Sequence, residues 1–167
     1  MNSSFANLFV ALQQQIHSKV PTIVTIDQDL GQFKSTIRPA VSFPCVLIDF
    51  EDFKFENLSN NVQTAEGIIV FKLCFEVKSN SSFSTPNSFV EQAIGFYDLE
   101  WLLHKALQNY NAGNSYGNLC RTTALTQNRT DNYRIREIRY SITFDDYSTK
   151  NELTLKTVSL GIVDEIV

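Results

Sequence analysis

The chain has few of the residues that enzymes use most often for catalysis and metal binding. Its 167 residues include only two histidines, His17 and His104. Each falls within a predicted helix and has no Cys, Asp or Glu at metal-ligand spacing, which argues against a metal site. Neither is placed where a loop would present it to a nucleophile, as a catalytic triad requires. We therefore predict no catalytic residues, no metal ligands and no cofactor.

Cysteine and glycine are also scarce. The number of cysteines is odd, and no two of them form a C-x-x-C pair. They are widely spaced, at Cys45, Cys74 and Cys120. This pattern favours buried free thiols in a reducing compartment over a disulfide framework, and it argues against a zinc site. The six glycines are scattered and none builds a phosphate-binding loop.

The chain lacks a basic block and a long apolar run. Its formal net charge is −4, and phosphate neutralisation needs clustered Lys and Arg, so we predict no specific nucleic-acid binding. The stretch from Arg134 to Arg139 is modestly basic, but few aromatic residues lie near it, and we interpret it as a solvated or inter-subunit strand end. No apolar run approaches about twenty residues, and the first residues lack the pattern of a signal peptide, so we predict no membrane partner.

Acidic residues are the one group in the sequence that could carry out catalysis or bind a metal ion. A cluster of four is the best candidate for divalent-metal or acid–base chemistry: Asp49, Glu51, Asp52 and Glu56. Phenylalanines alternate with these carboxylates, as is typical of the solvated face of a strand. We favour the strand face, and a carboxylate-based metal-dependent enzyme stays open as the weaker alternative.

What the chain has in quantity is apolar and aromatic residues, including thirteen Phe. Its length suits one domain with a packed core. We predict a single domain over residues 1–167, with a core over about 5–146 and a C-terminal extension, about 151–167, that the pattern does not place.

Two helices are predicted from apolar residues at helical spacing. The first runs from about Phe5 to His17 and is capped by Ser3 or Ser4. The second begins at Thr85-Pro86, an N-cap followed by proline, and runs to about Asn109. Its inward face is predicted to comprise Phe89, Ala93, Phe96, Leu99, Leu103, Ala106 and Leu107.

Strands are predicted around residues 23–27, over 45–55 and 64–78, and as a hairpin over 119–126 and 134–144. In the strand over 64–78, Ile69, Phe71 and Leu73 share one side and alternate with Ile68 and Val70. The long connection over 28–44 resembles a binding element or arm. The order of elements predicts an α+β fold, a mainly antiparallel sheet with one face covered by two helices.

Over residues 5–146 the chain resembles phage tail terminator or tail-completion proteins, of the minor tail protein, prophage type. The resemblance rests on the order of an amphipathic helix (FANLFVALQQQI), a proline-marked strand (PAVSFPCVLIDF), a long alternating strand (QTAEGIIVFKLCFEV), a helix (LEWLLHKAL) and a last strand ending in RYSITFDD.

This resemblance implies a structural protein, not an enzyme. It implies self-association into a ring, a hexamer being one option, that caps the tail tube and joins it to the head connector. The tail-tube and head-connector proteins would then be its partners, first in the bacterial cytoplasm and then in the virion tail. A subunit of a contractile-injection or conjugative apparatus is the alternative. Candidate interface residues are Phe33, Arg38, Phe43, Ile68, Val70, Arg134 and Arg136.

Overall fold

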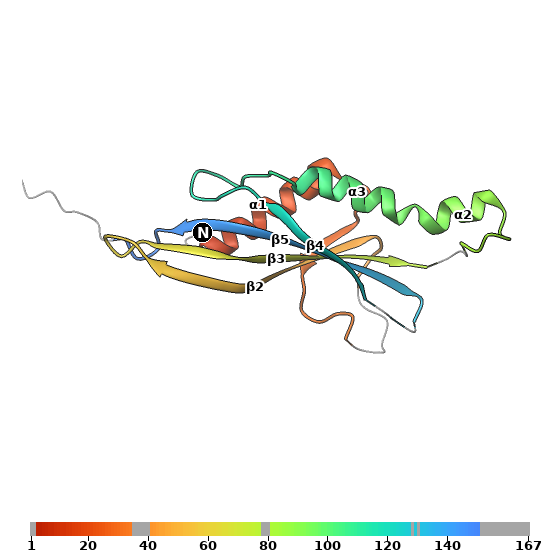
Figure 1. Ribbon diagram of the computed structural model, residues 1–167, viewed down its shortest axis with the longest axis horizontal. Coiled ribbons are helices and arrows are strands. Elements are labelled where there is room, and N and C mark those ends of the chain that lie inside the picture. The colour runs from red at the N-terminus through yellow and green to blue at the C-terminus, as the bar shows by residue number, and fades with distance from the viewer. Residues whose placement is uncertain (1–2, 35–40, 78–80, 128, 130, 151–167) are drawn as a thin grey trace, which may run out of the picture.

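The computed structural model describes residues 3–34, 41–77, 81–127, 129 and 131–150. They form a long twisted sheet with the helices along one face (Figure 1). The elements in chain order are α1 (Ser4–Lys19), β1 (Thr25–Gln28), β2 (Cys45–Asn57), β3 (Gln63–Glu76), α2 (Asn87–Ile94), α3 (Phe96–Leu107), β4 (Cys120–Gln127) and β5 (Tyr133–Asp146). The predicted α+β class is confirmed.

The sheet has the strand order β1-β2-β3-β5-β4. All neighbours pair antiparallel except β1, which pairs parallel with β2 at one edge. The central pair, β3 and β5, stays in register from Gln63 opposite Asp146 to Glu76 opposite Tyr133. At about 3.4 Å per residue this pair is about 45 Å long, so the sheet has two well-separated ends.

The main core lies between the sheet and two of the helices, α1 and α3. Leu8, Leu12 and Ile16 form the buried stripe of α1, whose first turn is capped by the Ser3 side chain, as expected from the sequence. The predicted alternation along β5 is confirmed, because Ile138, Tyr140, Ile142 and Phe144 are all buried. Period-2 strands and a period-3.6 helix therefore present matching apolar faces to one another.

A smaller cluster covers part of the opposite face of the sheet. It contains Phe33, Cys45, Leu47, Cys74 and Ile135. Phe43 packs beside it and stacks on Tyr133, with ring centroids 5.2 Å apart. The described parts of the connection over 28–44 thus pack on the chain's own sheet. Leu30, in the same connection, is 77% exposed, and the binding element or arm stays a prediction.

The sheet end next to the start of α1 is closed by aromatic rings. Phe5 contacts Phe50, Phe53 and Phe144 with centroids 4.9–5.4 Å apart. A register shift between Glu51 and Lys54 turns Phe53 onto the backbone of Gly67. A Cβ at Gly67 would lie 2.4 Å from that ring, so this close approach requires glycine.

The second predicted helix is in fact bent into two. α2 and α3 meet at Gly95, and the N-cap position of α2 is Pro86, with no side-chain cap hydrogen bond. The predicted cap at Thr85 is therefore wrong. In Figure 1, α2 extends α3 toward the far end of the molecule, and α2 has no buried residue.

Two of the three cysteines are buried as predicted. Cys45 and Cys74 are free, buried and opposite each other on β2 and β3. Cys120 is free but exposed, because it opens the edge strand β4, and the prediction of burial fails there.

Candidate interaction surface

The acidic cluster of β2 does not gather into a site. The Asp49 carboxylate accepts a hydrogen bond from the backbone N–H of Phe50, at 2.9 Å, and Glu51 pairs with Arg139 at 3.1 Å. Asp52 lies at the register shift, with φ +53°. In the described part of the chain, no group of three or more His, Cys, Asp or Glu side chains is arranged to hold a metal ion.

His104 is held by the main core. Its Nδ1 lies 2.9 Å from the hydroxyl of Tyr140, which is fully buried. Burial, followed by the charge of Arg121, lowers the pKa of His104. A neutral imidazole that orients one buried tyrosine is a structural feature of the helix–sheet interface.

Most of the basic residues near β5 are already paired. Arg136 makes a two-pronged contact with Glu100, at 2.6 and 2.9 Å. Arg139 binds Glu137, and Arg129 binds Asp131. Arginines committed to carboxylates in this way offer little charge to a phosphate backbone.

Several predicted interface residues lie inside the fold. Phe33 and Val70 are 8% and 1% exposed, so neither offers contact area in the described structure, and Phe43 packs against Tyr133. Ile68 is half-buried. Arg38 lies outside the described residues. Arg136 is tied to Glu100, which leaves Arg134 as the predicted residue with capacity for a partner.

The far end of the molecule is its most apolar exposed region. We call residues 87–101 the overhang, because α2 and the start of α3 reach beyond the core here. Phe89 is 50% exposed, Tyr97 52% and Trp101 58%. Side chains of this kind gathered at one end of a chain mark a contact surface for another macromolecule.

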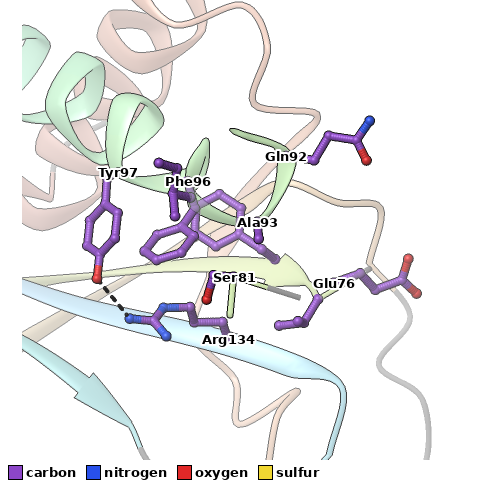
Figure 2. Close-up of a pocket in the computed structure, with 10 residues that line it drawn as sticks. Glu76, Ser81, Gln92, Ala93, Phe96, Tyr97 and Arg134 are labelled. Carbon is purple, nitrogen blue, oxygen red and sulfur yellow. Dashed lines mark hydrogen bonds between the residues drawn. The ribbon is translucent and has the colours of Figure 1, made fainter. Parts of the chain in front are cut away.

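A cleft of about 390 Å³ lies between the overhang and the ends of β3 and β5. Figure 2 shows the ring of Phe96 and the phenol of Tyr97 above the side chain of Arg134. The remaining wall is formed by Phe75, Glu76, Val77, Ser81, Gln92, Ala93 and Ile94. The cleft thus combines apolar and aromatic side chains with polar ones, and Arg134 is the one cation of its lining.

Arg134 is only partly satisfied in this cleft. Its guanidinium carbon lies 4.2 Å from the centroid of Phe96, and one terminal N–H donates to the Tyr97 hydroxyl at a long 3.4 Å. Its Nε is buried and has no hydrogen-bond partner among the described residues. A buried donor without an acceptor is costly, and the long contact to Tyr97 satisfies the guanidinium only weakly.

The overhang was missed because helical spacing was read as an inward-facing stripe. Phe89 was placed on the same face as Phe96 and Leu103, but α2 has no buried residue and Phe89 is 50% exposed. The one available signal was Gly95, a poor helix former between the two halves.

No protein-family model matches the chain, and no curated protein matches it. No helix of the described residues is both long and apolar enough to cross a membrane.

Proposed function

We propose that the chain is a structural assembly protein of a phage or prophage tail. In this role it self-associates into a ring, caps the tail tube and joins the tube to the head connector. The observation that carries the proposal is the overhang with its open cleft, a built contact surface at one end of an elongated subunit. A surface at one end suits head-to-tail contacts, which close into a ring when the rotation between neighbours permits.

Two further observations support the proposal. The order of helices and strands is the one on which the resemblance to tail terminator proteins rests. Of the polar groups that the sequence singled out for chemistry, Asp49, Glu51 and His104 are engaged in structural ion pairs or hydrogen bonds. An assembly role uses the exposed surface of this molecule and asks nothing of those groups.

The proposal is tested by negative-stain electron microscopy of the protein mixed with the tail-tube protein encoded beside it. We expect rings, or tubes capped at one end and held to a fixed length. Tubes that grow without limit and ignore the added protein would overturn the proposal.

A matched pair of variants locates the contact. Phe89→Asp places a charge on the overhang, where the side chain is 50% exposed, and we expect loss of rings and of capping. Burying Phe at a contact is worth about 1.5–3 kcal/mol, and a buried unpaired charge adds a further penalty. Leu30→Asp is the control, because Leu30 is 77% exposed and lies outside the overhang. Equal effects from both variants would remove the overhang from the contact.

A further inference from the structure

The cleft under the overhang has the chemistry of a site for an apolar peptide that carries a carboxylate. Its walls supply Phe75, Val77 and Ile94, and Arg134 supplies a guanidinium that pairs with no carboxylate among the described residues and has one terminal N–H held only by the long contact to Tyr97. Glu76 is the one acidic residue of the lining, and Figure 2 shows its carboxylate turned away from Arg134. An incoming carboxylate would therefore meet an uncompensated guanidinium against an aromatic face, where charge-assisted hydrogen bonds are strong.

The chain itself contains a segment of this composition. Residues 151–167 end in Gly-Ile-Val-Asp-Glu-Ile-Val, which places Asp164 and Glu165 between two pairs of branched apolar residues. The segment lies outside the described residues. Its aliphatic side chains suit the apolar walls of the cleft, and its two carboxylates suit Arg134.

The starting point of this segment favours a neighbouring copy over the same chain. The Thr149 hydroxyl donates a hydrogen bond to the backbone carbonyl of Asn61, at 2.8 Å. Residue 149, two positions before the segment begins, therefore lies beside the β2–β3 turn. The cleft lies at the other end of β3, about 50 Å away at the rise of a strand. The fourteen Cα–Cα steps from Lys150 to Asp164 span at most about 50 Å, so the segment could reach its own cleft only when fully extended. In a head-to-tail arrangement, the cleft of a second copy can lie closer to the segment, so the segment need not be fully extended.

We propose that residues 151–167 of one subunit bind in the cleft of the next, with Asp164 or Glu165 accepting hydrogen bonds from Arg134. This inference rests on the proposed ring, since it names the contact that links neighbouring subunits. The overhang then acts as a clamp, and each subunit contributes a clamp at one end and a peptide at the other.

The test is direct binding of a labelled synthetic peptide, residues 151–167, to the full-length protein, followed by fluorescence anisotropy. We expect saturable binding, weakened at least about tenfold by Arg134→Gln, because a hydrogen bond to a charged group is lost. A peptide carrying Asp164→Asn and Glu165→Gln should lose a similar factor on the natural protein and little more on the Arg134→Gln protein. Arg121→Gln, on exposed β4, is the matched control and should bind as the natural protein does.

Charge reversal separates recognition from a folding defect. Arg134→Glu should abolish binding of the natural peptide and restore binding of one that carries Asp164→Lys and Glu165→Lys. Circular dichroism checks that each variant is folded. Absence of saturable binding, or binding that ignores the charge at position 134, overturns the inference. Tubes capped at fixed length by the same protein would then leave the proposed function standing, with a different contact between subunits.

Discussion

α2 and α3 are two halves of one bent helix, yet they lie in opposite surroundings. α3 lies over the sheet and buries Leu103, Ala106 and Leu107. α2 follows the same spacing of apolar residues and buries none of them. Amphipathic spacing thus creates an apolar face in both halves, and the extent of the sheet decides whether that face becomes core or contact surface.

The same contrast holds for two arginines on β5. Arg136 and Arg134 are two residues apart and so point to the same face of the sheet. Arg136 meets Glu100 of α3, with exposed side-chain fractions of 15% and 11%. Arg134 meets aromatic rings and retains an unpartnered Nε. Arg136 stabilises the fold through its ion pair, whereas Arg134 is the residue that we propose binds a ligand.

The largest expected effect separates the two halves of the helix. Leu103→Ala removes a fully buried side chain from α3 and should lower the free energy of unfolding by about 2–5 kcal/mol. Phe89→Ala on α2 should change it by no more than about 0.5 kcal/mol, because no core is disturbed. Urea denaturation followed by circular dichroism measures both. Similar losses for the two variants would contradict the distinction between core and contact surface.

The next effect separates the two arginines. Glu100→Ala leaves Arg136 largely buried without its partner and should cost about 2–3 kcal/mol of unfolding free energy. Arg134→Gln should cost no more than about 1 kcal/mol, since it removes an unsatisfied donor and the cation–π contact with Phe96. The same denaturation assay applies, with Glu100→Gln as a variant that retains the shape of the side chain. A larger loss from Arg134→Gln than from Glu100→Ala would show that Arg134 stabilises the fold.

The smallest expected effect concerns pH and the paired side chains on the opposite face. Burial alone would raise the pKa of Glu137, but hydrogen bonds from Arg139 and Gln127 outweigh it, and the pKa is lowered. A carboxylate whose folded pKa lies below its unfolded value, about 4.3, stabilises the fold above that value and stops doing so as pH falls through the folded pKa.

Unfolding free energy should therefore decrease as pH is lowered below about 4.3, and Glu137→Gln should make the decrease shallower. Urea titrations between pH 7 and pH 3 on the natural protein and this variant measure the difference. Identical pH profiles for the two proteins would show that Glu137 does not contribute to the pH dependence of the unfolding free energy.

The sequence predicted the fold better than the contact surface. Alternation along β5 identified four of its five buried residues, and helical spacing placed α1, because both patterns depend on neighbours close along the chain. The same logic failed for Phe89, whose exposure depends on where β3 ends, thirteen positions earlier in the chain. Phe33 and Val70 show the opposite difference: they were predicted as interface residues, but both are buried in the fold.

The candidate site needed information that local patterns do not contain. Arg134 and Arg136 were both predicted as interface residues. They are two positions apart on one strand, so the sequence pattern predicts the same face for both and does not distinguish them. Glu100 distinguishes them, and it comes from α3, thirty-six positions from Arg136. The phenylalanines beside the acidic residues of β2 were correctly read as strand alternation up to Phe50, where the register shift begins.

The unbroken pairing of β3 with β5 restricts how the length of this molecule can change. Inserting one residue into either strand would reverse the side chains beyond it and exchange core for surface, unless a bulge absorbs the extra residue. Inserting two residues into each strand would preserve both faces and lengthen the pair by about 7 Å. The distance between the β2–β3 turn and the cleft is therefore adjustable only in steps, and evolution can tune the spacing of its two ends without redesigning either one.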